Sequence, residues 1–69
     1  MNSIKEIGKI IRERRKNLKL EIEDLKDYSD ITYTTISNIE NGKANPTIKT
    51  LQKILEPLGL EIKINIKEK

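Results

Sequence analysis

The side chains most suited to chemistry in this 69-residue sequence are uncharged hydrogen-bonding groups that cluster in residues 32–42. Hydroxyls and amides repeated along one helix can bond to the edges of nucleic-acid bases. Catalysis is a poor match to the composition, because the chain contains no Cys and no His and so lacks thiol nucleophiles and imidazole acid–base groups. We therefore expect a protein that is not an enzyme and that has no metal site and no cofactor.

Helical spacing divides residues 32–42 into two faces. Ile36, Ile39 and Glu40 recur at i, i+3 and i+4, so they share one side of a helix and should turn inward. Thr32 can cap the first turn, and residues 41–42, Asn-Gly, can end the helix. The outward face then carries Tyr33, Thr34, Ser37 and Asn38. The pattern predicts a short helix whose uncharged outer face fits the major groove of DNA.

The composition allows one small domain and distributes its charge unevenly. The net charge is +3; residues 1–19 carry seven basic and two acidic side chains, residues 20–40 one and six, and residues 41–69 six and three. The basic flanks suit phosphate groups, although Lys and Glu also serve simply to keep a small protein soluble. The chain has no apolar stretch long enough for a signal peptide or a membrane span, so we expect a cytoplasmic protein without a membrane partner.

A helix from Ser3 to Leu18 should support the polar stretch. Ser3 can cap it, and its apolar stripe consists of Ile4, Ile7, Ile11 and Leu18, widened by Ile10. Arg15 falls on the same stripe, and an unpaired buried guanidinium is strongly unfavourable. We therefore predict that Arg15 pairs with Glu40; the alternative is that both side chains turn out to solvent.

A second short helix is predicted over residues 20–28, with Leu25 as its clearest buried residue and Leu20, Ile22 and Tyr28 partly buried. Its first turn is acidic, as the positive end of a helix dipole favours. Residues 29–31 form only a tight link, in which Asp30 can adopt a positive φ. Two short helices joined in this way form a helix-turn-helix.

The last helix should follow a loop over residues 43–47. We predict that Asn45 caps this helix and that Pro46 occupies its first position. Pro57 and Gly59 should end it. The apolar stripe consists of Ile48, Leu51, Ile54, Leu55 and Leu58.

The pattern changes to strict alternation at residues 60–67, which predicts a β-strand. Its apolar positions are Leu60, Ile62, Ile64 and Ile66. Since no second strand is evident, the simplest partner is another copy of the chain, which would form a two-stranded ribbon across a homodimer. A frayed tail, or a strand offered to a different protein, are the alternatives. The expected fold is mainly α, with four to five helices in residues 1–59 and a dimerisation strand and tail in residues 60–69.

Residues 7–60 resemble the phage-repressor-like helix-turn-helix proteins of the Xre family. The specific core is the Ile-Ser-x-Ile-Glu-x-Gly-Lys pattern at residues 36–43, and the ending, residues 51–62, is most similar to HipB-type antitoxins, in which a strand joins two protomers. The other matching positions are Ile7, Gly8, Arg15, Leu20, Leu25, Ile31, Thr32, Thr35, Pro46, Thr47, Leu51, Ile54, Leu55, Leu58 and Gly59. The resemblance implies a DNA-binding regulator.

The resemblance also implies roles for individual residues. Base-reading positions fall on Thr32, Tyr33, Thr34, Ser37 and Asn38. Phosphate contacts fall on Asn41, Lys43 and the backbone at Ile22, and Lys49 is a further candidate from its charge, together with Lys19 and Arg12. The pair Arg15–Glu40 matches a structural ion pair of the family. Three positions depart from the family pattern, because Ile22 replaces a phosphate-binding Gln, Lys26 a small residue and Asp30 the usual turn Gly.

The expected function is that of a sequence-specific transcriptional repressor that binds an inverted-repeat operator in double-stranded DNA as a homodimer. The HipB-like ending adds an expected role as the antitoxin of a HipAB-like module, with a HipA-like kinase toxin as partner. Two alternatives are a stand-alone Xre-type repressor and a toxin-binding interaction module with little affinity for DNA.

Overall fold

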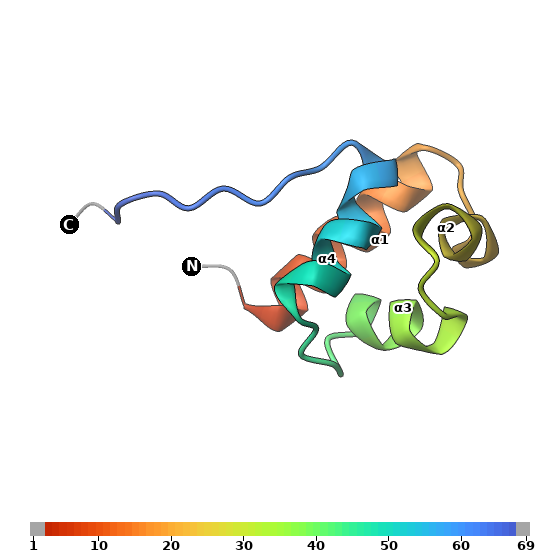
Figure 1. The fold of residues 1–69 in the computed structure, drawn as a ribbon, viewed down its shortest axis with the longest axis horizontal. Coiled ribbons are helices and arrows are strands. Elements are labelled where there is room, and N and C mark those ends of the chain that lie inside the picture. The colour runs from red at the N-terminus through yellow and green to blue at the C-terminus, as the bar shows by residue number, and fades with distance from the viewer. Residues whose placement is uncertain (1–2, 68–69) are drawn as a thin grey trace.

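The computed structural model describes residues 3–67 and is mainly helical, as predicted (Figure 1). Four α-helices are followed, within that range, by one turn of 3₁₀-helix and an extended segment. The elements are α1 (Ile4–Asn17), α2 (Ile22–Ser29), α3 (Tyr33–Glu40), α4 (Ile48–Leu55) and η1 (Glu56–Leu58). None of the helices described has the length and apolar composition that crossing a membrane requires.

Helix α1 begins with a capping box. The Ser3 hydroxyl accepts a hydrogen bond from the Glu6 backbone N–H at 3.1 Å, and the Glu6 carboxylate accepts one from the Ser3 N–H at 3.0 Å. The bond from the Ser3 backbone is the main cause that lowers the pKa of Glu6. The prediction that Ser3 caps this helix is therefore confirmed.

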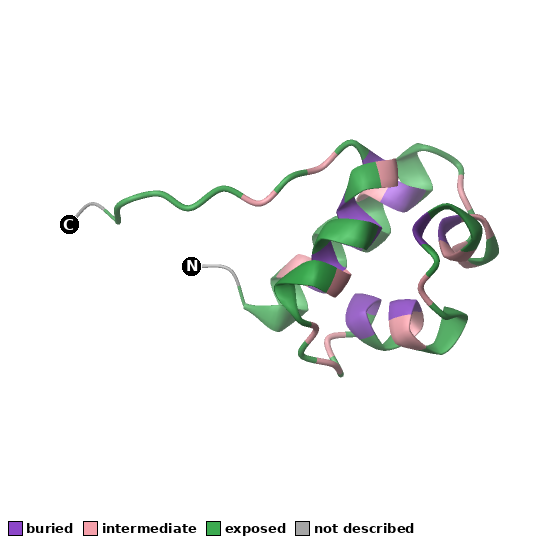
Figure 2. Cartoon of the chain, viewed as in Figure 1, coloured by how far each residue is buried: buried purple, intermediate pink, exposed green. Residues whose placement is uncertain are grey.

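Buried residues line the inner sides of the helices (Figure 2), and the hydrophobic core that they form is aliphatic. Its buried side chains are Ile11, Leu25, Ile36, Ile39, Leu51, Ile54, Leu55 and Leu58. Helix α1 packs closely on α3 because Gly8 lies against the carbonyl groups of Ile39 and Glu40; a Cβ there would be 2.9 Å from the Glu40 oxygen and closer still to that of Ile39. This close contact sets how near α3 lies to α1.

The turn between α2 and α3 has the backbone geometry that the sequence predicts. Asp30 adopts the left-handed conformation with φ 61°. Ser29 is buried; its hydroxyl donates to the Leu25 carbonyl at 2.6 Å and accepts from the Ile31 N–H at 3.3 Å. These bonds satisfy backbone groups at the end of α2 and hold the angle between the two helices.

The start of α4 differs from the prediction. Thr47, not Asn45, is the cap, since its hydroxyl accepts from the Thr50 N–H at 3.1 Å, and Pro46 lies in the preceding loop instead of in the first turn. Both Asn and Thr are good helix caps, so the sequence was compatible with a helix that begins after Asn45 or after Thr47. The longer loop is the one in which Ala44 packs against the core.

Five apolar residues are more exposed than predicted; besides the three described next, Ile4 on α1 is 37% exposed and Ile48 on α4 is 61% exposed. Tyr28 is 66% exposed instead of partly buried, because Ser29, four residues after Leu25, and not Tyr28 continues the buried side of α2. Leu18 and Ile10 are 41% and 47% exposed, since the inward stripe of α1 is narrowed to the line of Ile11 and Arg15.

Residues 60–67 are extended, as alternation predicts, but the predicted β-strand is not formed in the described part of the chain. The segment runs away from the helices without a neighbouring strand, on the side opposite α2 and α3 (Figure 1). A strand requires ladder hydrogen bonds, and residues 3–67 of a single chain supply no partner for them. Leu60 and Ile62 pack partly against the core, whereas Ile64 and Ile66 are 94% and 95% exposed.

Candidate nucleic-acid interface

Helix α3 turns Ile36, Ile39 and Glu40 inward and leaves a polar, uncharged face in solvent; Figure 2 shows the buried and exposed parts of the helix. Thr32, Thr34 and Asn38 are exposed and Tyr33 is 47% exposed, whereas Ser37 is only partly so. Of the five residues expected to contact bases, four therefore lie on the open surface and one at its edge.

Of these five side chains, those of Thr32 and Ser37 are already engaged in hydrogen bonds within the protein, whereas those of Thr34 and Asn38 are free to bond to a ligand. The Thr32 hydroxyl accepts from the Thr35 N–H at 3.3 Å and donates to the Thr35 hydroxyl at 2.8 Å. It therefore caps α3, as predicted, and its proton is used within the helix. The side chains of Thr34 and Asn38 make no hydrogen bond within residues 3–67, so their donors and acceptors point to solvent.

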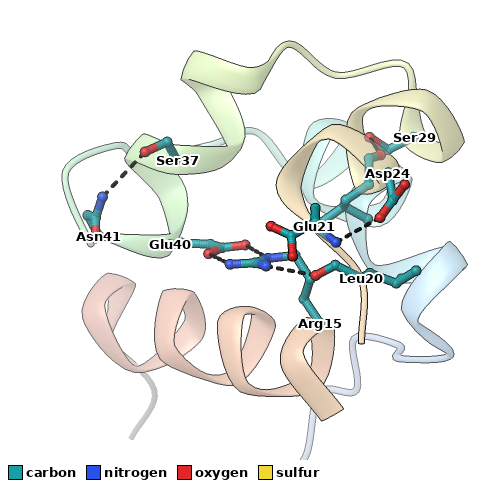
Figure 3. A network of polar contacts seen from close by, with 9 residues as sticks. Arg15, Leu20, Glu21, Asp24, Ser29, Ser37, Glu40 and Asn41 are labelled. Atoms are coloured by element: carbon teal, nitrogen blue, oxygen red, sulfur yellow. Dashed lines mark hydrogen bonds and ion pairs between the residues drawn. The ribbon is translucent and has the colours of Figure 1, made fainter. Parts of the chain in front are cut away.

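A buried ion pair holds α3 against α1. The Arg15 Nε and Nη2 atoms donate to the two carboxylate oxygens of Glu40 at 2.8 and 2.9 Å, and both residues are 7% exposed (Figure 3). Arg15 Nη1 also donates to the Leu20 carbonyl at 2.8 Å. The hydrogen bond to Glu40 is the main cause that raises the pKa of Arg15. One guanidinium thus joins the end of α1, the chain leading into α2 and the last turn of α3.

The exit from α3 carries two of the expected phosphate-contact residues. The Asn41 side-chain amide donates to the Ser37 hydroxyl at 3.4 Å (Figure 3). Gly42 has φ 71°, and the Lys43 N–H donates to the Asn38 carbonyl at 2.8 Å, which ends the helix. Asn41 and Lys43 are exposed at this end of the polar face, and Lys49 is exposed on α4.

The opposite end of the interface is mixed in charge. A groove of about 600 Å³ there is lined by Arg15, Lys16, Lys19, Leu20, Glu21, Ile22, Glu23, Asp24 and Tyr33. Ile22, expected to contact phosphate through its backbone, is half-buried at the start of α2. The neighbouring Asp24 carboxylate accepts from the Glu21 N–H at 2.8 Å, so an anion approaching this helix end would meet carboxylates.

Sequence reasoning missed one basic residue at this groove, Lys16. Lys16 lines it although only its neighbours Arg12 and Lys19 were expected to face phosphate. Lys19 lies there because it takes φ 58°, which turns the chain between α1 and α2. The left-handed conformation could not be predicted, since Lys carries no preference for it.

Known proteins resemble this chain over most of its length. The helix-turn-helix family model matches residues 11–64. The HTH-type transcriptional regulator PuuR of Escherichia coli is 38% identical over 55 residues, which are 80% of this chain and 30% of that protein. The ImmF control region 10 kDa protein of Bacillus phage phi105 is 30% identical over 60 residues, 87% of this chain and 67% of the phage protein. The chain thus spans about a third of the length of PuuR.

Proposed function

Because the chain belongs to the helix-turn-helix family of DNA-binding regulators, we propose that it represses transcription by inserting α3 into the major groove of a specific double-stranded DNA site. The observation that carries this proposal is the exposed, uncharged face of α3, backed by a buried ion pair. A face that merely kept the protein soluble would be expected to carry charge in a chain with 36% charged residues.

The side chains on that face suit recognition of particular bases. The Asn38 amide has the donor and acceptor needed to bind adenine at two atoms, and the Thr34 methyl group can contact the methyl group of thymine. Tyr33 can reach a base edge or a phosphate. Arg and Lys, which bind guanine, are missing from the α3 segment Tyr33–Glu40, so we propose an operator rich in A·T pairs at the contacted positions.

The proposed phosphate contacts lie mainly at the exit from α3. Asn41 and Lys43 are exposed next to the reading face, and Lys49 adds a charge from α4. The contact at the Ile22 backbone is supported less, because Asp24 and Glu23 lie in the same helix turn. Binding should therefore weaken as salt rises, since each neutralised phosphate releases counterions.

We further propose that the protein acts as a homodimer on an inverted repeat. Residues 60–67 support this, because they are extended and leave Ile64 and Ile66 almost wholly exposed. Two recognition helices related by a two-fold axis would enter successive major grooves about one helical turn apart.

A narrower role as the antitoxin of a HipAB-like module is also proposed, on the likeness of residues 51–62 to HipB-type antitoxins. The stand-alone repressor is the competing candidate, and the likeness to PuuR, a transcriptional regulator, favours regulation of transcription in general. Purification from the native host decides between them. A HipA-like kinase in the complex supports the antitoxin, and a homodimer without a kinase-sized companion supports the plain repressor.

The main test is selection of binding sites from a random DNA library, followed by titration with the selected duplex. Asn38→Ala and Thr34→Ala should each weaken binding by about 1–3 kcal/mol and relax the preference at one base pair. Gln52→Ala, which removes an exposed amide from α4, is the matched control and should leave binding unchanged. If the two α3 variants bind the duplex as tightly as the wild type, α3 is not the reading element.

The same titration separates DNA binding from a protein-interaction module. In a module with little affinity for DNA, no sequence would be enriched from the library, and the Asn38 and Thr34 variants would lose toxin binding instead. In a repressor, enrichment of one inverted repeat is expected, with all variants folded by circular dichroism.

A further inference from the structure

We infer that residues 60–67 of two copies pair antiparallel with Ile64 on the two-fold axis, so that Glu61 of each copy lies opposite Lys67 of the other. This inference rests on the proposed homodimer, to which it adds the register of the two tails and the surface that they cover. It follows from the apolar face of the tail, from an apolar groove beside it and from the positions of the charges.

The tail, which here means residues 60–67, begins in a groove that it fills only partly. Leu60 and Ile62 pack against the core, and beside them lies a groove of about 260 Å³. Two residues at this groove remain open to solvent, Ile10 at 47% and Ile48 at 61% exposure. The residues that line it are Ile7, Ile10, Ile11, Ile48, Leu51, Leu55, Leu60, Glu61, Ile62 and Lys63.

The rest of the tail cannot cover that groove from the same chain. The alternation of the sequence places Ile64 and Ile66 on the same face as Leu60 and Ile62, but Ile64 and Ile66 are almost wholly exposed, because the extended segment runs away from the helices (Figure 1). A second copy of the chain would cover both the open groove and the exposed side chains of Ile64 and Ile66. Residues opposite each other in an antiparallel pair point to the same face, with Cβ atoms about 5 Å apart. Ile66 of the second copy would therefore lie beside Ile62 and over the groove.

The charges select one register. With Ile64 opposite Ile64, Ile62 faces Ile66 and Glu61 faces Lys67, and both pairs occur twice by symmetry. A shift that centres the pair on residue 63 places Lys63 opposite Lys63, and a shift to residue 65 places Lys63 opposite Lys67. Like charges in directly opposed positions are destabilising.

Two further shifts are disfavoured for other reasons. Centring on Ile62 pairs Glu61 with Lys63 but leaves residues 65–67 of each tail without a partner. Registers whose two-fold axis falls between two residues place isoleucines opposite polar residues, so the two apolar faces would point to opposite sides of the ribbon.

The first experiment is a charge swap measured by sedimentation velocity over a range of protein concentrations at low salt. Glu61→Lys and Lys67→Glu should each weaken the dimer about tenfold, because each reversal opposes like charges at two symmetric positions. The double variant Glu61→Lys/Lys67→Glu should recover the wild-type dissociation constant. Asp27→Lys is the control for the change of charge, since α2 lies on the far side of the molecule from the tail (Figure 1).

Recovery of dimerisation in the double variant also distinguishes the proposed Glu61–Lys67 pair between two chains from an ion pair within one chain. Lys63 lies 3.9 Å from Glu61 in the same tail, and both side chains are more than 70% exposed, so that ion pair contributes little. The double variant removes the ion pair within the tail but restores the one between strands. If the single variants dimerise as well as Asp27→Lys, or if the double variant is as weak as the singles, the register is wrong.

The second experiment uses the fact that the chain has no Cys. Ile64→Cys should form a disulfide-linked dimer on oxidation, because Cα atoms of directly opposed strand residues lie within disulfide range. Ile62→Cys and Ile66→Cys should each remain monomeric by non-reducing electrophoresis but should cross-link when mixed. Self-linking of Ile62→Cys would overturn the register.

Failure of this inference can be told from failure of the proposed function. A wild-type protein that stays monomeric at every concentration, yet enriches one DNA site in the selection, overturns the pairing and leaves DNA recognition by α3 intact. A dimer with the expected cross-links that enriches no DNA sequence supports the pairing and overturns the repressor.

Discussion

At the scale of single residues, the most consequential contact is the one between Arg15 and Glu40. It places two charges where the core is otherwise aliphatic, and all the polar atoms of the pair that are buried have partners within the described residues. Such a pair does not need to add to the free energy of unfolding. It instead fixes the position and the rotation of α3 relative to α1, because the guanidinium binds the carboxylate through two hydrogen bonds.

Removal of one partner should therefore be much worse than removal of both. Arg15→Ala leaves the Glu40 carboxylate buried without a counter-ion and should lower the free energy of unfolding by about 3–5 kcal/mol. Arg15→Met/Glu40→Leu should be far more stable than the single variant. Urea unfolding at neutral pH measures both. A double variant less stable than Arg15→Ala would show that the pair itself supplies the stability.

At the scale of elements, the packing of α1 on α3 depends on the missing side chain at position 8. Ala normally favours a helix over Gly by up to about 1 kcal/mol. Gly8→Ala should nevertheless destabilise the fold, because the new Cβ would collide with the carbonyl oxygens of Ile39 and Glu40. Lys9→Ala, one position along on the exposed side of α1, is the control and should be neutral or mildly stabilising in thermal unfolding. Equal melting temperatures for the two variants would contradict the close contact.

The start of α1 should contribute to stability in a pH-dependent way. The hydrogen bonds from Ser3 lower the pKa of Glu6 in the folded state, so their contribution is present above the pKa of the unfolded chain and is lost as pH falls through the folded value. Glu6→Gln should be less stable than wild type at pH 7, and the difference should shrink in acid. Chemical unfolding at a series of pH values tests this. A difference that grew in acid would have the wrong sign.

Ser3→Ala removes the other half of the same capping box. It should lower stability by about 0.5–2 kcal/mol, which is the usual effect of losing a cap. Combining it with Glu6→Gln should give less than the sum of the two single effects, since each variant already disrupts the shared bonds. Strict additivity would show that the two hydrogen bonds act independently.

At the scale of the whole molecule, the extended tail, the polar face of α3 and the acidic helix α2 lie on different parts of the structure. The extended tail and α3 lie on opposite sides of the α1–α4 pair, so dimerisation through the tail would leave the polar face of α3 open (Figure 1). The acidic residues are concentrated in α2, and basic side chains lie at the ends of α1 and beyond α3. DNA should therefore approach along α3 from the side of Lys43.

The salt dependence of operator binding provides the test at this scale. A plot of the logarithm of the binding constant against the logarithm of the salt concentration should become less steep by about 0.9 for each phosphate that a variant no longer neutralises. In a dimer one substitution removes two such contacts, so the change should be about twice as large. Lys43→Ala and Lys49→Ala should both show this in fluorescence anisotropy. Lys26→Ala on the acidic helix α2 is the control. An unchanged slope for both variants would show that phosphates are bound elsewhere.

The sequence by itself determined the elements and their faces. Period-3.6 apolar stripes predict α1, α2, α3 and α4, and the inward positions of Ile36, Ile39 and Glu40 follow from spacing alone. Local chemistry likewise determined the caps at Ser3 and Thr32 and the positive φ of Asp30. These features depend on neighbours within four residues, so a single sequence contains the information.

Only the tertiary structure decided what depends on distant neighbours. The sequence allows a cap at Asn45 or at Thr47, and the structure uses Thr47 after a loop in which Ala44 packs against the core. The exposure of Tyr28 likewise depended on which side of α2 the other helices cover. The tail illustrates the same limit. Alternation specifies an extended chain, but a strand is defined by hydrogen bonds to a partner, and residues 60–67 of one chain have no such partner within the part that the structure describes.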